Sequence, residues 1–211
     1  MGDMGEKLQI AVLGAGNVGG ALGRIWLSKG HKVTFGVPDP QKTNRKTGNA
    51  EVTTNKDASA DADVVVLSVP WPAAHEAIRN SGDVTNKVLI DCTNPLAPDL
   101  SGLVIGGTTS AAEMVATWAP GARVIKAFNT IGAANYGNAQ FGLQRADGFY
   151  CGDDQQAKNV AKQLIEDVGL DPVDVGPLKN ARLLEPLAML WIDLAVNQGQ
   201  GTNHGFKLLR R

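Results

Sequence analysis

The chain has 211 residues, of which 43% are hydrophobic and 19% charged, and its net charge is -1 at pH 7. This composition is typical of a globular protein and excludes a disordered, collagenous or coiled-coil chain. It offers no basic surface of the kind that nucleic-acid-binding proteins carry, so we expect no nucleic-acid partner. Lys207, Arg210 and Arg211 form a basic cluster at the C-terminus, where such clusters are usually solvated tails.

Two cysteines, Cys92 and Cys151, stand far apart in the sequence, which argues against a disulfide framework and favours a reducing compartment. The first seven residues are polar, and no stretch of about 18 apolar residues occurs anywhere. No metal-ligand spacing is evident. We therefore expect a cytoplasmic protein with no membrane association and no metal.

Four short apolar runs, rich in Val, Ile and Leu without strict alternation, are typical of parallel strands covered by helices on both faces. They span residues 10–13, 64–69, 88–90 and 124–128. A helical stripe follows the first run and is ended by Gly30; its members are Val18, Ala21, Leu22, Ile25 and Trp26. Residues 32–37 then complete a right-handed βαβ unit.

Further helices are expected over residues 72–80 and 110–118, while residues 43–55 form a polar loop. Strands that alternate with helices in this way indicate a doubly wound parallel sheet, the Rossmann fold. We expect an α/β protein with a dinucleotide-binding domain over residues 1–135 and a small C-terminal α/β cap over residues 136–211, packed with it as one unit.

The cap begins with an irregular segment, residues 135–147, rich in Gly, Asn and Gln. An amphipathic helix over residues 157–168 follows, with Asp153 or Asp154 as its N-cap and Gly169 as its stop. A short strand at 172–175 precedes a helical segment at 180–197, where Pro186 should kink the helix or mark a restart. Residues 183–196 are apolar on most faces, which predicts burial against the chain's own domain or a second subunit.

The glycine turn after the first strand carries the clearest chemistry. The pattern GxGxxG, here Gly14, Gly16 and Gly19, follows an apolar strand, opens an amphipathic helix and leads into a second strand. Gly14 permits the tight turn, Gly16 lets backbone amides approach a pyrophosphate, and Gly19 lets the helix pack closely on the strand. The helix N-terminus offers N–H groups and a partial positive charge to the phosphates. The sequence therefore predicts a nicotinamide-dinucleotide site.

At the adenosine end of that site, some residues favour NAD and others favour NADP. Asp39 stands about 20 residues beyond Gly19, a spacing suited to the ribose hydroxyls of NAD, but it lies past the strand end between two prolines. Lys42, and also Arg45 or Lys46, could meet the 2′-phosphate of NADP. We favour NADP and keep NAD as the alternative.

Polar residues and prolines at three strand exits should surround the nicotinamide riboside. They are Ser68, Val69, Pro70 and Trp71 after the third strand, Asn94 and Pro95 after the fourth, and Phe128, Asn129 and Thr130 after the next. His75, one turn into a helix near this site, is a weaker candidate for substrate contact, and a helix-surface role suits it better. No catalytic acid, base or nucleophile is assigned, which fits hydride transfer between two cofactors.

Several sequence blocks in order resemble the coenzyme-F420-dependent NADP oxidoreductases, and the resemblance covers nearly the whole chain. The blocks are the glycine turn with Asn17, residues 68–71, residues 128–131, residues 151–154, residues 176–178 and residues 180–183. The same module is similar to the reductase domain of the membrane metalloreductases. The resemblance implies a pyrophosphate site at Ala15, Gly16, Asn17 and Val18, an adenosine-phosphate site at Val37, Pro38 and Lys42, and Ala133 near the nicotinamide. Family members commonly carry an arginine where Val37 and Pro38 stand, so only Lys42 matches there.

The resemblance also implies that the C-terminal helix closes one side of the coenzyme cleft, which favours a homodimer. We therefore expect an oxidoreductase that transfers hydride between NADP(H) and a deazaflavin, F420, or a flavin-like acceptor, with small molecules or cofactors as its partners. Two alternatives stay open. One is a non-catalytic nucleotide sensor or electron-transfer partner, and the other is an imine reductase related to the pyrroline-carboxylate reductases.

Overall fold

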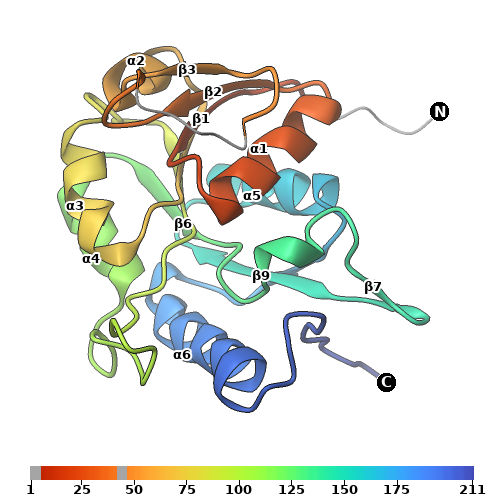
Figure 1. The fold of residues 1–211 in the computed structure, drawn as a ribbon. Helices are drawn as coiled ribbons and strands as arrows, with labels where there is room; N and C mark the ends of the chain where they lie inside the picture. The colour runs from red at the N-terminus through yellow and green to blue at the C-terminus, as the bar shows by residue number, and fades with distance from the viewer. Residues whose placement is uncertain (1–5, 42–46) are drawn as a thin grey trace.

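The computed structural model describes residues 6–41 and 47–211. Its centre is an eight-stranded sheet in the order β10-β9-β6-β5-β4-β1-β2-β3 (Figure 1). The strands are β1 (Gln9–Leu13), β2 (Lys32–Gly36), β3 (Glu51–Thr53), β4 (Val64–Leu67), β5 (Val88–Asp91), β6 (Arg123–Lys126), β9 (Asp147–Gly152) and β10 (Asp171–Asp174). Neighbours run parallel except β9, which is antiparallel to β6. The order of the first six strands is that of a doubly wound dinucleotide-binding sheet, as the sequence predicts.

Helices cover both faces of this sheet (Figure 1). They are α1 (Asn17–Ser28), α2 (Asn55–Ala60), α3 (Trp71–Arg79), α4 (Ala111–Trp118), α5 (Gln155–Asp167) and α6 (Ala181–Ile192). One hydrophobic core lies under α1 and α5, and the other lies under α2, α3, α4 and α6. Adjacent residues of β1 enter opposite cores, Val12 the first and Leu13 the second, which is why its sequence is continuously apolar.

Two strands are shorter than their apolar runs. β4 ends at Leu67 and β6 at Lys126, two residues before the ends that we expected from residues 64–69 and 124–128. Ala127 and Phe128 are nevertheless buried. The exit loop is part of the core, so apolar character here marks burial and not strand geometry.

The segment expected as a polar loop over residues 43–55 holds regular structure in its described part. β3 lies at the edge of the sheet, and α2 follows it directly, with the Thr54 hydroxyl accepting the Asp57 N–H at the helix N-terminus. Both elements are short and partly polar, because an edge strand needs little apolar surface. This expectation was therefore wrong for residues 51–55.

The C-terminal part extends the same sheet. β9 was not foreseen; it follows an irregular segment that contains a hairpin of β7 (Gln140–Phe141) and β8 (Gln144–Arg145). α5 has Asp154 as its N-cap, as predicted, and its side chain accepts the Ala157 N–H. The boundary that we place at residue 135 stays a prediction.

Of the two alternatives expected at Pro186, a kink or a restart, the structure excludes the restart, and the kink stays a prediction. α6 runs through Pro186 without a restart and continues as a π-helical turn over Asp193–Asn197. Leu184 and Glu185, just before the proline, are buried against the sheet and α4. Tertiary packing thus stabilises the helix even though Pro186 cannot donate a backbone hydrogen bond. Within the described ranges, no helix is long and apolar enough to span a membrane.

Candidate functional site

The glycine turn has the geometry that its sequence predicts. Gly14 has a φ of +102°, which favours glycine, and its N–H donates to the Gly36 carbonyl at 3.0 Å. A Cβ on Gly19 would lie 2.1 Å from the Gly14 carbonyl oxygen, so α1 can approach β1 only because residue 19 has no side chain. A Cβ on Gly16 would meet nothing within 4 Å. The turn is therefore closed toward the sheet and open on the side where a ligand would approach.

The N-terminus of α1 points at this opening. Gly16 is the N-cap residue and no side chain caps the helix. The first-turn amides have no acceptor within the helix, and they carry the positive end of its dipole. Backbone donors without a side-chain cap are what a pyrophosphate needs, so the residues present fit a dinucleotide.

Ser68, the residue that follows β4, binds the backbone of the glycine turn. Its hydroxyl lies 3.0 Å from the carbonyl oxygens of both Leu13 and Gly14 and donates to this backbone. Val69 approaches the same turn, since its Cγ1 lies 2.8 Å from the position of a Cβ on Gly14. The structure thus gives both residues a role in shaping the turn. Direct contact with a cofactor stays a prediction for them.

The exits of β5 and β6 are joined by two asparagines. The Asn94 amide donates to the Asn129 carbonyl at 3.1 Å, and the Asn129 amide donates to Asn94 Oδ1 at 3.1 Å and to the Leu184 carbonyl at 3.1 Å. Phe128, just before Asn129, has a φ of +61°, an unusual conformation for a bulky residue. Its carbonyl accepts the Tyr136 hydroxyl at 2.7 Å. As predicted, these two exit loops lie at the same edge of the sheet. The strained backbone of Phe128 makes that edge a candidate site, because such strain is concentrated at functional sites.

The remaining residues expected at the nicotinamide lie around this edge. Pro70 is the N-cap residue of α3, and Thr130 is 2% exposed, which leaves it little surface for a ligand. Trp71 stacks on Trp118 of α4 with ring centroids 5.2 Å apart. Pro95 accepts the Val104 N–H through its carbonyl at 2.7 Å. Cofactor contact stays a prediction for all of them.

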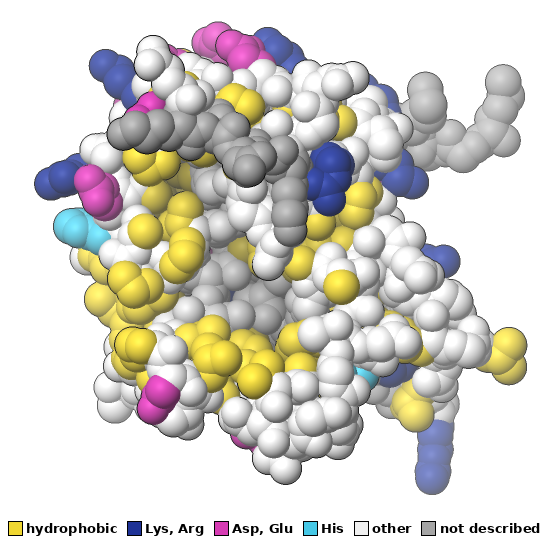
Figure 2. Space-filling model, viewed as in Figure 1, with side chains coloured by type: hydrophobic (Ala, Val, Ile, Leu, Met, Phe, Trp, Pro, Cys, Tyr) yellow, Lys and Arg dark blue, Asp and Glu magenta, His cyan; other side chains and the backbone are white. Residues whose placement is uncertain are grey.

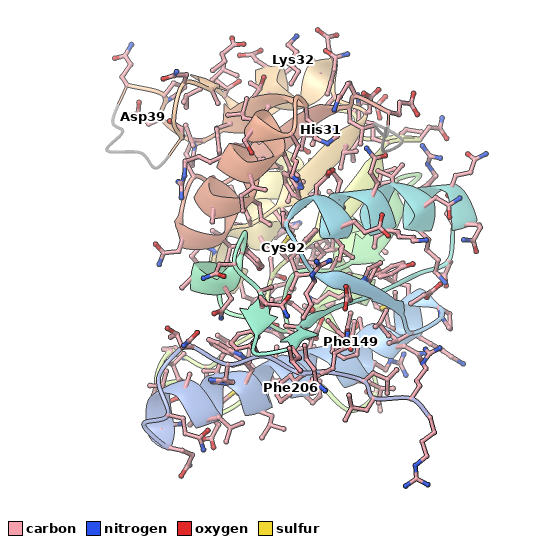
Figure 3. The ribbon with its side chains drawn as sticks, turned by 90° about the vertical axis from the view of Figure 1, so that its right-hand side faces the viewer. His31, Lys32, Asp39, Cys92, Phe149 and Phe206 are labelled. Carbon is pink, nitrogen blue, oxygen red and sulfur yellow. The ribbon has the colours of Figure 1, made fainter. Side chains whose placement is uncertain are left out.

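At the adenosine end, Val37 is buried, and its N–H donates to the Thr53 carbonyl at 3.0 Å. The Asp39 carboxylate accepts the Gln41 N–H at 3.0 Å, within its own loop. Figure 3 shows Asp39 at the opposite end of the molecule from Phe206 of the C-terminal segment. Lys42, Arg45 and Lys46 lie outside the described residues. The choice between NAD and NADP therefore stays a prediction.

A pocket of about 510 Å³ adjoins the glycine turn. Its walls come from α1, from the segment after β6, from α6 and from the C-terminal segment, and its lining residues are Asn17, Val18, Ala21, Arg24, Gly132, Ala133, Ala134, Trp191 and Thr202. Figure 2 shows a hollow at the centre of this face, with hydrophobic side chains gathered beside α3 and α4 and over α6. Ala133, expected near the nicotinamide, thus lies in the same pocket as Asn17 and Val18 of the turn.

Trp191 is fixed at the rear of that pocket. A Cβ on Gly132 would lie 2.3 Å from the Trp191 ring, so the ring rests on a bare backbone. The ring also stacks on His204 with centroids 4.7 Å apart, and its Nε1 donates to the His204 carbonyl at 2.9 Å. Sequence analysis placed Trp191 in an apolar helix without a site role. The signal that could have found it is Gly132, three residues after an exit-loop asparagine.

Behind the strand exits lies a buried charge cluster formed by Lys126, Asp91 and Glu185, each no more than 1% exposed. Lys126 Nζ lies 2.9 Å from Asp91 Oδ2 and 3.0 Å from Glu185 Oε1. Burial alone would lower the pKa of Lys126, but the two carboxylates outweigh it and raise that pKa, so the ammonium is retained. Glu185 also accepts the N–H groups of Ala111 and Ala112 at the start of α4. Sequence analysis missed this cluster, although a charge inside an apolar run is its signature.

The prediction for the C-terminal tail needs correction, and the prediction for the apolar helix is narrowed. Lys207 is not a solvated tail residue, because its Nζ lies 2.7 Å from Asp147 and 2.6 Å from Asp171. The chain does not bury every face of α6 itself, since Leu183 is 67% exposed and Leu190 49% exposed, and the other predicted alternative, burial against a second subunit, stays a prediction.

Two of the three histidines and both cysteines offer no acid–base or nucleophilic chemistry at the site, while the third histidine, His204, lies against Trp191. His75 packs against Trp118 with centroids 4.9 Å apart, and His31 bonds to Asp167 and to the Leu8 N–H far from the exits. Burial raises the pKa of the Cys151 thiol to about 12 and that of Cys92 further still, so neither is a nucleophile. No group of metal ligands occurs among the residues that the structure describes.

Comparisons with known proteins agree with this geometry. Residues 9–95 match the family model described as NADP oxidoreductase, coenzyme F420-dependent. An F420-dependent NADP reductase of Methanothermobacter thermautotrophicus is 32% identical over 209 residues, covering 90% of each chain. The chain belongs to the F420-dependent NADP reductase family. It is an NAD(P)-dependent oxidoreductase, as the resemblance implies.

Two further proteins, one of them a solved structure, are similar to this chain. The crystal structure of a putative F420-dependent NADP reductase from Arthrobacter sp. FB24 superposes with a TM-score of 0.87 at 29% identity, covering 96% of this chain and 100% of that one. Metalloreductase STEAP3 of Rattus norvegicus is 27% identical over 88% of this chain but only 38% of its own length. The predicted fold and both predicted resemblances are confirmed.

Proposed function

We propose that this protein transfers hydride between NADP(H), held at the glycine turn, and a deazaflavin such as F420 or a flavin-like acceptor, held in the adjoining pocket. The acceptor pocket is defined as the space between Val18, Ala133 and Trp191. One observation carries the proposal: this pocket shares Asn17 and Val18 with the turn that fits the pyrophosphate. Two ligands placed there would lie side by side at the sheet edge.

The preference for NADP over NAD rests on two points. Asp39 lies three residues beyond the end of β2 at Gly36, between Pro38 and Pro40, which is past the usual place of a ribose-binding carboxylate. The relatives with whole-chain similarity are named NADP reductases. Lys42 is our proposed partner for the 2′-phosphate, as a point charge.

The proposed chemistry needs positioning more than proton transfer. When bound, the reduced nicotinamide supplies a hydride, and the acceptor takes it up together with a proton to complete its reduction. The residues of this chain would hold the two rings in contact and exclude water between them. Trp191, held by Gly132 and His204 and 8% exposed, contributes an apolar side chain to the wall of the acceptor pocket.

A two-step experiment tests the proposal. First, NADPH and NADH are titrated into the protein by fluorescence, and we expect NADPH to bind at least tenfold more tightly, about 1.4 kcal/mol. Second, NADPH oxidation is followed with deazaflavin, flavin, ferric and cyclic-imine acceptors. Turnover with deazaflavin or flavin supports the proposal. Binding without turnover would favour a nucleotide sensor, and turnover on the imine alone would favour an imine reductase.

We also propose that the protein is a homodimer. Leu183 and Leu190 stand seven residues apart in α6, about two turns, so they share one face of the helix, and they are 67% and 49% exposed. Apolar side chains gathered on one face usually mark an interface. Mass measurement in solution at micromolar concentration tests this, and a strict monomer would contradict it.

A further inference from the structure

The buried charge cluster lies directly behind the proposed nicotinamide site. Asp91 and Lys126 are the last residues of β5 and β6, and Lys126 Nζ donates to the Thr93 carbonyl at 2.6 Å. The next residue along the chain is Asn94, whose amide bonds to the β6 exit. Only one layer of exit-loop residues therefore separates the cluster from the place where the nicotinamide is proposed to lie.

The cluster carries more negative than positive charge. It holds one ammonium, on Lys126, and two carboxylates, on Asp91 and Glu185, all nearly inaccessible to solvent. The N–H groups at the start of α4 offset part of this charge, because they donate to Glu185. One charged pair close to the cluster compensates itself, since Arg182 donates to Glu113 at 2.6 Å and 2.8 Å. A net negative charge of up to one unit remains.

Such a charge acts differently on the two redox states of the cofactor. The nicotinamide ring is neutral when reduced and carries a positive charge once the hydride, with its two electrons, has left. A buried charge is poorly screened, so its field reaches a neighbouring site. The oxidised ring is thus attracted to the cluster, while the reduced ring is not.

We propose that the buried charge cluster sets the relative affinity of this site for the oxidised and reduced nucleotide, and thereby favours NADPH as the hydride donor. The inference rests on the proposed function. The hydride would pass to an acceptor of the deazaflavin or flavin class, which also takes a proton from solvent, so that atoms and electrons balance. Asp91 and Glu185 act through the field at the ring and not by touching it.

The test compares dissociation constants for NADP⁺ and NADPH in the wild type and two variants, Glu185→Gln and Asp91→Asn. Each variant removes one negative charge from a different element. In both, the ratio of the NADP⁺ constant to the NADPH constant should rise about threefold to tenfold, because the field of a buried charge is poorly screened. The midpoint potential of the bound nucleotide should rise correspondingly. Thermal unfolding checks that each variant is folded.

Glu185→Asp is the matched control, because it keeps the charge while it disturbs the contacts with Lys126 and α4. Its ratio should stay at the wild-type value even if both nucleotides bind more weakly. Equal weakening of both nucleotides in the Gln and Asn variants would overturn the inference and leave the cluster purely structural. A shift in the Asp control as large as in Glu185→Gln would overturn it too. Failure of the wild type to bind either nucleotide would instead refute the proposed function itself.

Discussion

Replacing Gly19 by alanine should loosen the fold at the nucleotide turn. The new Cβ would lie 2.1 Å from the Gly14 carbonyl oxygen, 2.3 Å from Ser68 Oγ and 2.9 Å from Val12 Cγ1. The nearest atom is backbone, so α1 itself must move. Overpacking of this kind costs about 1–3 kcal/mol, of which the better helix propensity of alanine returns roughly 0.5–1 kcal/mol. We expect a net loss of about 1–2 kcal/mol in the free energy of unfolding.

Gly16→Ala is the matched control. Its Cβ would meet nothing within 4 Å, and the φ of -80° at this residue suits alanine. We expect a small change in stability, a few tenths of a kcal/mol from the weaker N-cap, but at least tenfold weaker NADPH binding, because the methyl group enters the pyrophosphate path. Urea unfolding and NADPH titration measure the two effects. Unchanged stability in Gly19→Ala, or unchanged NADPH binding in Gly16→Ala, would refute this account of the turn.

Three other predictions follow from single contacts. Trp191→Leu should raise the KM for the acceptor several-fold while the NADPH dissociation constant changes less than twofold; equal effects on both would place Trp191 outside the acceptor pocket. Tyr136→Phe removes the hydroxyl that donates to the carbonyl of strained Phe128 and should cost about 1 kcal/mol in urea unfolding, whereas no loss would show that the bond does not hold this exit. Hydrogen bonding from Arg182 holds the pKa of Glu113 below its ordinary value, so the stability from this pair is present above about pH 4.5 and is lost as the pH falls through the lowered pKa. Glu113→Gln should therefore flatten the acid limb of a stability–pH curve, and an unaltered limb would contradict the assignment.

The sequence predicts most of the sheet because the relevant physics is local. Central strands such as β1 are buried on both faces and so read as continuous apolar runs. The glycine turn is predictable because the spacing of its glycines between a strand and a helix is a recurrent motif, although Ser68 and Val69, which crowd Gly14, are distant in sequence. β3 escaped detection because an edge strand of three residues leaves almost no pattern.

The site beyond the turn depends on contacts distant in sequence. Trp191 reaches the pocket by resting on Gly132, and Glu185 meets Lys126 from another element. A lone charge or tryptophan within an apolar helix gives no indication of its partner, so periodicity alone could not pair them. Pro186 shows the converse, because packing overrides a strong local preference against helix.

The central claim is direct hydride transfer from NADPH to a deazaflavin or flavin-like acceptor at this sheet edge. The most direct test uses NADPH deuterated at the transferred position of the nicotinamide, with a deazaflavin as acceptor, whose accepting carbon retains the isotope. We predict that the label appears in the reduced deazaflavin and not in solvent, and that Trp191→Leu slows this transfer. Tight NADPH binding with no label in the deazaflavin and no NADPH oxidation by a flavin would contradict the claim.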